Sequence, residues 1–366
     1  MKKTIKLFFL IMCFLLAGCG IKKADNILEE LEKKLENANS YYVEGLMEII
    51  NNEDTYTYDV KVSYQKEDYY KIELVNQLNN HEQVILRNDD GVYVVTPSLN
   101  KSFKFQSDWP YNNSQVYLLN SIIEDLKEDE KREFKTTDNG YFLSSSVNYP
   151  NNRTLVSQNV YIDKNGKITK TEVVDKDGNV QIAMKFNTIE YDKKFDKNYF
   201  ELSSLLKTNT KKEDTNNNSS NNTNNNVTTE NNQTSNNTNE NSNTTSSQTK
   251  QTATIDDVIY PMYLPSNTYL TSQETIDTET GQRLILTFGG DSSFILVEET
   301  VNYEEEGLII PVNGEFEFLS DVIGVIGNNS ITWHSNGIEY YIASDTIATA
   351  ELVEIARSIS VLPVSK

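Results

Sequence analysis

The chain has 366 residues and a formal net charge of -21. Residues 20–206 carry 23 Lys and Arg against 32 Asp and Glu, residues 207–252 carry 4 against 4, and residues 253–366 carry 3 against 18. Because nucleic-acid affinity depends on basic side chains that contact phosphates, this balance argues against a nucleic-acid partner.

The first segment is typical of an export signal. A lysine-rich start precedes an apolar run that is shorter than the ~20 residues needed to span a bilayer. The small residues Ala17 and Gly18 then lead to Cys19, an order that resembles the bacterial lipobox, in which the thiol receives a diacylglycerol. The resemblance implies a signal peptide over residues 1–18, a lipidated N-terminus over residues 19–24, and a chain anchored on the extracytoplasmic face of the cell membrane.

The alternative interpretation is a plain secretory signal, or an uncleaved anchor, with a chance cysteine. The chain has two cysteines, Cys13 and Cys19, and Cys13 lies in the segment that would be removed. A mature chain lipidated on Cys19 keeps no free thiol, which excludes disulfides, Cys-ligated metals and Cys nucleophiles.

Residues 25–206 are expected to form the first folded unit. Apolar residues recur at helical spacing over residues 25–38, with Asp25 as the expected N-cap. A second helical stripe over residues 113–129 indicates a helix that interrupts a sheet.

The sheet itself is predicted by alternation. Residues 55–64 place Tyr and Val on one face and polar residues on the other, and residues 70–76 and 180–186 repeat the pattern. The expected fold class is therefore α+β, with an antiparallel sheet and two amphipathic helices. Four pairs suit the positive-φ positions of tight hairpin turns: Asp90-Gly91, Asn139-Gly140, Asn165-Gly166 and Asp177-Gly178.

One stretch carries a family resemblance. Residues 88–119, NDDGVYVVTPSLNKSFKFQSDWPYNNSQVYLL, are similar to the LolA-like lipoproteins of Gram-positive spore formers, including sporulation and germination lipoproteins, and residues 191–202 resemble the closing segment of that family. Element order and length over residues 25–206 resemble the LolA/LolB-type carrier fold, also seen in RseB-like sensor domains. The resemblance implies a curved half-barrel sheet plugged by helices. A tethered chain departs from soluble carriers, which disfavours shuttling of lipoproteins to an outer membrane.

The apolar face of the sheet supplies the candidate binding residues. If the helices leave space on the concave side, a cavity remains for a lipid or lipoprotein ligand. The alternative, which we favour because every such fold needs a core, is that these residues are packed core. The candidate cavity-lining residues are Tyr56, Tyr58, Val60, Val62, Tyr64, Tyr70, Ile72, Leu74, Ile182, Met184 and Phe186.

A linker is expected over residues 207–252. Residues 215–250 are almost wholly Asn, Thr, Ser and Gln, and such a segment buries too little apolar surface to offset its ordering entropy. A random coil of this length typically separates its ends by roughly 35 Å.

Residues 253–366 are expected to form a smaller α+β unit. A closing helix is predicted over residues 349–359 with Thr349 as its N-cap. The stretch ITWHSNGIEYYIAS and the helix after it resemble an uncharacterised domain at the C-termini of membrane-tethered Firmicutes proteins, which implies no chemistry. Strands are predicted over residues 258–270, 283–301 and 329–345, with a hairpin turn at Asn336-Gly337.

Catalytic patterns are missing from the sequence. The two histidines, His81 and His334, fall one in each unit and are interpreted as turn or surface side chains rather than zinc ligands. Residues 163–167 and 175–179 are interpreted as hairpin turns rather than calcium loops, and residues 303–307 as a solvated acidic loop. We therefore expect no enzyme activity, no catalytic residue, no metal and no cofactor.

Two functional hypotheses follow. The first is a membrane-anchored lipoprotein whose LolA-like domain binds an apolar ligand or a protein partner in cell-envelope or spore biology. The alternative is a regulatory partner of a cell-wall (cortex) hydrolase, or an RseB-like envelope sensor. The two hypotheses differ in whether the concave face of the sheet is open.

Overall fold

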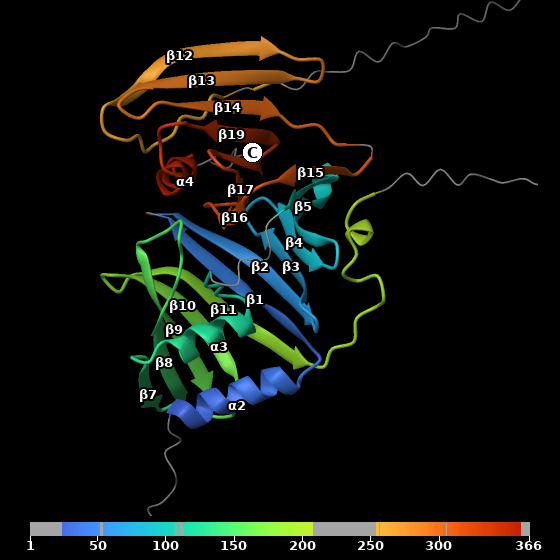
Figure 1. Ribbon diagram of the computed structural model, residues 1–366, viewed down its shortest axis with the longest axis vertical. Coiled ribbons are helices and arrows are strands. Elements are labelled where there is room, and N and C mark those ends of the chain that lie inside the picture. The colour runs from blue at the N-terminus through green and yellow to red at the C-terminus, as the bar shows by residue number, and fades with distance from the viewer. Residues whose placement is uncertain are drawn as a thin grey trace, which may run out of the picture.

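The structure is a computed structural model, and it describes residues 24–51, 54–106, 109, 113–207, 254–255, 257–304 and 306–359. Most of the described chain is β-sheet with few helices (Figure 1), which confirms the expected predominance of sheet. We call residues 24–207 the N-terminal unit and residues 254–359 the C-terminal unit. The helices are α2 (Ala24–Asn37), α3 (Leu119–Glu128) and α4 (Thr349–Arg357), with short 3-10 helices at Pro97–Leu99 and Leu202–Ser204.

The strands form two sheets. The first has the order β15-β6-β5-β4-β3-β2-β1-β11-β10-β9-β8-β7 and the second has the order β12-β13-β14-β19-β18-β17-β16. Strands of the first sheet are β1 (Ser40–Asn51), β2 (Asp54–Gln65), β3 (Tyr69–Asn76), β4 (Glu82–Asn88), β5 (Gly91–Thr96), β6 (Lys101–Phe105), β7 (Glu133–Thr137), β8 (Gly140–Ser146), β9 (Leu155–Asp163), β10 (Ile168–Asp175), β11 (Val180–Tyr191) and β15 (Leu308–Val312). Strands of the second are β12 (Thr268–Asp277), β13 (Gln282–Gly290), β14 (Phe294–Thr300), β16 (Glu315–Phe318), β17 (Ile323–Ile326), β18 (Ser330–Ser335) and β19 (Ile338–Ala343).

Hairpins build most of the first sheet. All four predicted Asx-Gly pairs lie at the turns that join consecutive antiparallel strands, with Gly91 and Gly140 as the first residues of β5 and β8. Gly166 and Gly178 have φ values of 78° and 83°, a left-handed conformation that glycine adopts without steric cost. The predicted turn chemistry is confirmed.

The two helices of the N-terminal unit cover one face of the first sheet at its lower end in Figure 1. Leu31 of α2 and Ile122 of α3 belong to one core cluster with the apolar face of β1–β3 and β11. Two details of the prediction were wrong. Helix α2 begins at Ala24, so Asp25 lies in its first turn, where it pairs with Arg132 at 2.5 Å. Helix α3 begins only at Leu119. Leu118 before it has an extended backbone, and the Ser114 N–H donates to the carbonyl of Asn148 in the neighbouring loop.

The other face of the first sheet is covered by the closing segment of the N-terminal unit. Phe200 and Leu206 pack with Val84, Leu86 and Tyr93 in a separate cluster. The 3-10 helix Leu202–Ser204 lies in this segment.

The C-terminal unit packs α4 on one face of the second sheet, with Leu352, Ile355, Ala356 and Ile359 buried. The helix N-cap is Ala348 rather than Thr349.

The predicted strand over residues 258–270 was wrong except at residues 268–270, which begin β12. Residues 258–267 form no strand, because Pro261 and Pro265 lack the N–H that a sheet ladder needs. They cross the sheet instead, and the Ile259 backbone N–H donates to the buried Glu298 carboxylate at 3.1 Å. Burial raises the pKa of Glu298 to about 7. Strands β15, β16 and β17 were not predicted.

Candidate functional site at the junction of the two units

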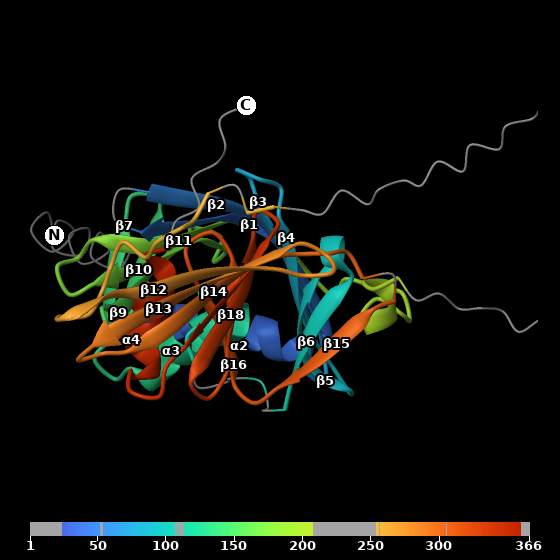
Figure 2. The same cartoon turned by 90° about the horizontal axis from the view of Figure 1, so that it is seen from above.

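The C-terminal unit adds a strand to the sheet of the N-terminal unit. Strand β15 pairs in parallel with the edge strand β6, from Leu308 opposite Lys101 to Val312 opposite Phe105. Figure 2 shows the two strands side by side. The first sheet is therefore built from both units, although more than 200 residues separate the two strands in sequence.

The C-terminal unit also packs against the apolar face of the first sheet. Phe316 of β16, with Ile323 and Val325 of β17, belongs to the same core cluster as the apolar face of that sheet. The Phe316 ring lies 6.0 Å from the Phe105 ring and 5.9 Å from the Trp109 ring, both edge-on. Such aromatic pairs add ~0.5–1.5 kcal/mol beyond area burial.

Side-chain amides bind the backbone of the C-terminal unit at this interface. The Gln83 side chain donates to the Ile323 carbonyl at 3.1 Å and accepts from the Ile323 N–H at 2.6 Å. Asn76 donates to the Asp321 carbonyl at 3.0 Å, and the Tyr58 hydroxyl donates to the Ser320 carbonyl at 3.0 Å. These buried contacts satisfy backbone groups that would otherwise lack partners.

A charged cluster lies at the other end of the junction. The Lys101 ammonium donates to the Glu339 carboxylate at 2.7 Å and lies 3.2 Å from the His334 Nε2 atom. Burial alone would raise the pKa of Glu339, but His334 and Lys101 together lower it to about 2. His334 is buried because Lys101 and Phe103 of β6 pack against it, so its assignment to the surface or a turn was wrong.

His81 lies in the turn between β3 and β4, as predicted. Its Nε2 atom is buried with no hydrogen-bond partner among the described residues. Burial, with the charge of His334, lowers the pKa of His81 to about 4. Although both units contribute a histidine to this region, the described residues contain no group of three or more His, Cys, Asp or Glu side chains that would hold a metal.

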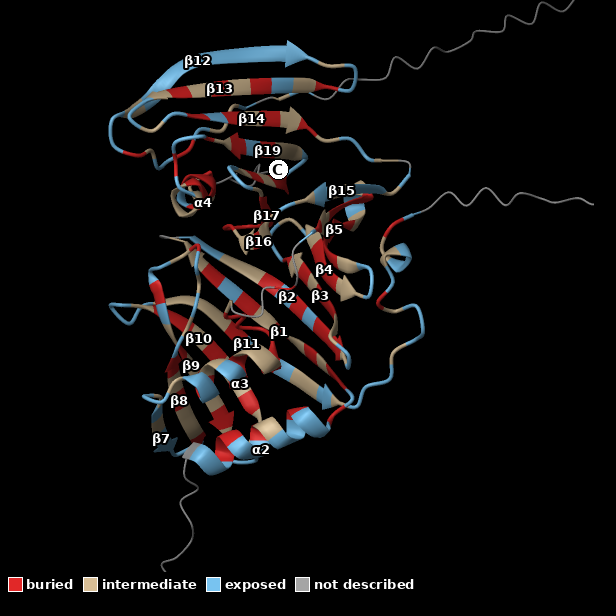
Figure 3. Ribbon diagram, in the orientation of Figure 1, coloured by how far each residue is buried: buried red, intermediate tan, exposed pale blue. Residues whose placement is uncertain are grey.

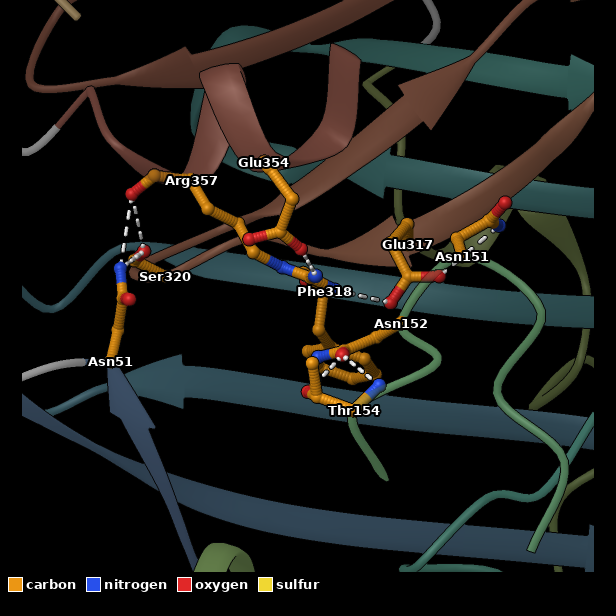
Figure 4. Close-up of polar contacts among 9 residues, drawn as sticks. All are labelled: Asn51, Asn151, Asn152, Thr154, Glu317, Phe318, Ser320, Glu354 and Arg357. Atoms are coloured by element: carbon orange, nitrogen blue, oxygen red, sulfur yellow. Dashed lines mark hydrogen bonds and ion pairs between the residues drawn. The ribbon is translucent and has the colours of Figure 1, made fainter. Parts of the chain in front are cut away.

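Figure 4 shows the third group of contacts, around Arg357 of α4. The guanidinium lies 3.1 Å from the Glu317 carboxylate and 2.8 Å from that of Glu354. Asn151, in the loop between β8 and β9, donates to Glu317 at 3.3 Å, and Asn51 of β1 donates to the Arg357 carbonyl at 3.0 Å. Burial raises the pKa of Glu317, against the charge of Arg357.

The space left at the junction is small. One pocket of about 220 Å³ lies beside Arg357 and has a largely polar lining that includes Asn152, Thr154 and Gln181. A neighbouring pocket of about 50 Å³ shares Ile182 and Phe318 with it. Sites for drug-sized ligands typically enclose ~300–1,000 Å³ and are mostly apolar.

A larger hollow of about 360 Å³ lies between α2, β2 and α3. Charged side chains contribute much of its lining: Glu32, Glu36, Lys66, Glu124 and Lys127. A hydrocarbon chain placed there would remove water from these charges, which is costly.

The predicted cavity-lining residues all lie in the first core or pack against it. Tyr56 and Ile182 are partly buried and pack against it, and Ile182 lines both junction pockets. Their contacts are those of core residues, and a role in ligand binding remains a prediction. The other nine are buried: Tyr58, Val60, Val62, Tyr64, Tyr70, Ile72, Leu74, Met184 and Phe186.

The remaining predicted features are local. Residues 163–167 and 175–179 form hairpin turns in which Asp163 and Asp175 accept backbone N–H groups. Among the described residues, no helix has the length and hydropathy needed to cross a bilayer. The predicted signal peptide, the lipidation of Cys19 and the predicted linker beyond Lys207 lie outside the described residues.

Sequence comparison places the chain in a family. The model of the sporulation protein YdcC-like family matches residues 1–200. The chain belongs to the YdcC-like family of sporulation proteins. Sporulation protein YdcC of Bacillus subtilis (strain 168) is 31% identical over 364 residues, which cover 98% of each chain. The predicted kinship with sporulation proteins is confirmed.

Solved structures are more distant. MucB in complex with MucA(peri) has 12% identity and a TM-score of 0.31 over 91% of this chain and 98% of that chain. The CwlD amidase from Clostridioides difficile in complex with the GerS lipoprotein has 20% identity and a TM-score of 0.28 over 46% and 96%. The LolA superfamily protein NE2245 from Nitrosomonas europaea has 12% identity and a TM-score of 0.29 over 49% and 97%. The family assignment depends on the sequence matches.

Proposed function

We propose that this chain is a non-enzymatic sporulation lipoprotein that is held at the outer face of the cell membrane through Cys19 and acts by binding a protein partner. The observation that supports a protein partner over a lipid is the occupied concave face. Phe316, Ile323 and Val325 of the C-terminal unit take the place that an apolar ligand would need. In this proposal the N-terminal unit is a LolA-like half-barrel whose opening is closed by helices and by the C-terminal unit.

Native mass spectrometry tests the choice between lipid and protein. Residues 20–366 keep every described residue and lack the lipidation site. We expect to detect this chain at the mass of the protein alone, with no bound lipid. A bound phospholipid or fatty acid that survives dilution would overturn the proposal and would show that the C-terminal unit moves aside for an apolar ligand.

Metabolic labelling tests the anchor. We expect radiolabelled palmitate to enter the full-length chain and the Cys19→Ala variant to leave the membrane fraction, since stable anchoring takes two or more acyl chains. A Cys19→Ala variant that stays equally membrane-bound would refute the lipid anchor.

The proposed partner class is a cell-wall enzyme of the sporulating cell. Membership of the sporulation family supports it, and the proposed extracytoplasmic location is the compartment in which such an enzyme acts. Crosslinking in sporulating cells should link the chain to a protein that acts on the cell wall, and a crosslink only to lipid-transport proteins would contradict this class.

A further inference from the structure

Strand β12 is an exposed edge of the second sheet. Among the described strands it pairs only with β13, and nine of its ten residues are exposed. Figure 3 shows the strand coloured as exposed along its whole length, on the side of the C-terminal unit that faces away from the first sheet. Its outer edge therefore presents unpaired backbone N–H and C=O groups to solvent.

The other sheet edges among the described residues are protected. Edge strand β15 contains Pro311, and edge strand β7 has five residues, including Lys135. Edge strand β16 has four residues and carries Phe316 into the core of the first sheet. Proteins commonly use proline, lysine and short length to prevent strand addition. Strand β12 has ten residues with no proline or lysine, and the shift in its register with β13 is confined to Leu270–Ser272, which leaves residues 272–277 in regular pairing.

The surroundings of β12 are acidic. The basic residues of the C-terminal unit are Arg283 and Arg357, and both are held in ion pairs with glutamates. Glu274 and Asp277 in β12 have no such partner on their own sheet. A second copy of β12 would place like charges opposite one another, which is unfavourable. A positively charged strand would not meet this repulsion.

Apolar side chains on β12 offer contact area to an added strand. Tyr269 is 61% exposed, Leu270 40% and Ile276 43%. The register places Glu274 in one row with Ile285, Val297 and Tyr341 on the face of the sheet opposite α4. Leu270 and Asp277 fall in the row on the α4 face. An extended segment that places basic residues in the row of Glu274 and apolar residues in the row of Leu270 would match this edge, and Asp277 adds to its negative charge.

We propose that the free edge of β12 docks an extended, positively charged segment of a partner protein, which joins the second sheet as an eighth strand. This inference rests on the proposed function, since it names the surface and the chemistry of the protein partner.

A synthetic strand tests the proposal. The probe is a ten-residue peptide that alternates Lys with Val, titrated by calorimetry into residues 20–366. One control peptide replaces every Lys with Glu, and another keeps the Lys residues and replaces the two central Val residues with Pro. We expect the first peptide to bind, neither control to bind, and the β12 amides to become protected from hydrogen exchange.

Matched variants locate the site. Glu274→Lys with Asp277→Lys should weaken binding about tenfold, the size expected for a loss of roughly 1.4 kcal/mol of charge attraction. Asp177→Lys with Asp196→Lys makes the same charge change on exposed positions of the N-terminal unit and should change binding less than twofold.

Several outcomes overturn the inference. They are equal binding of the proline peptide, equal weakening by both double variants, and no binding of the Lys peptide. If the peptide test fails and native mass spectrometry shows no bound lipid, the proposed protein partner must bind another surface of the chain. If native mass spectrometry shows bound lipid, the proposed function itself is refuted.

Discussion

The two sheets differ in what covers them. The first sheet has helices α2 and α3 and the C-terminal unit on one face, and the closing segment of the N-terminal unit on the other. The second sheet has α4 and residues 254–255 and 257–265 on one face. On its other face, β16 and β17 pack against the first sheet through Phe316, Ile323 and Val325, whereas the β12 edge is exposed. Both are built mainly from antiparallel hairpins, so strand chemistry does not separate them. The C-terminal unit contributes β15 to the first sheet and keeps the β12 edge of its own sheet exposed.

The largest expected effect comes from breaking the shared core. Phe316→Ala should lower the free energy of unfolding by about 3–5 kcal/mol, the usual cost of truncating a buried phenylalanine, although Phe316 belongs to the C-terminal unit. Chemical denaturation of the variant and the wild type measures this loss of stability. Met262→Ala is the control, because Met262 is 86% exposed. Equal stabilities for the two variants would show that the units do not share a core.

The buried acid of the second unit gives the next effect. Burial raises the pKa of Glu298 to about 7. The stability that this residue contributes to the folded state is therefore present below its unfolded pKa near 4.5 and is lost as the pH rises through about 7. Relative to the Glu298→Gln variant, the free energy of unfolding of the wild type should fall by about 3 kcal/mol between pH 4 and pH 8. Denaturant titrations at each pH measure the difference. A pH-independent difference would mean that water reaches this face of the second sheet, unlike the first.

A smaller effect should follow from Gln83→Leu at the junction. The substitution leaves the buried N–H and C=O of Ile323 without partners, which should cost about 2 kcal/mol. Denaturation and amide exchange at Ile323 measure it. Gln77→Leu, at an exposed position, is the matched control. If the Ile323 amide exchanges no faster in the Gln83 variant, the amide contact does not hold β17 against the first sheet.

The smallest of these effects is expected at the charged cluster. Lys101→Met removes a charge-assisted hydrogen bond and should cost about 1.5 kcal/mol. It should also raise the pKa of Glu339 from about 2, because the Lys101 charge that helps to hold it down is lost. NMR titration of the glutamate side chains reports this shift. An unchanged Glu339 titration would assign the low pKa to His334 alone.

Local patterns in the sequence predicted the local elements. Alternation over residues 55–64 and 180–186, the Asx-Gly turns and the helical stripes at residues 25–38 and 349–359 all correspond to observed elements. These signals are reliable because side-chain periodicity and glycine conformation depend on neighbouring residues. The lipidation of Cys19 remains a prediction from sequence.

Tertiary structure decided what those elements face. Alternation showed which face of β2 is apolar but not that Phe316 would cover it, since the covering residues lie more than 250 positions away. The strands over residues 308–326 are short and interrupted by Gly and Pro, so their pattern is weak, and their partners lie in the other unit. His334 likewise appeared to be a surface residue until Lys101 and Phe103 were placed over it. Periodicity identifies a buried face from local chemistry, whereas the identity of its cover depends on contacts between distant parts of the chain.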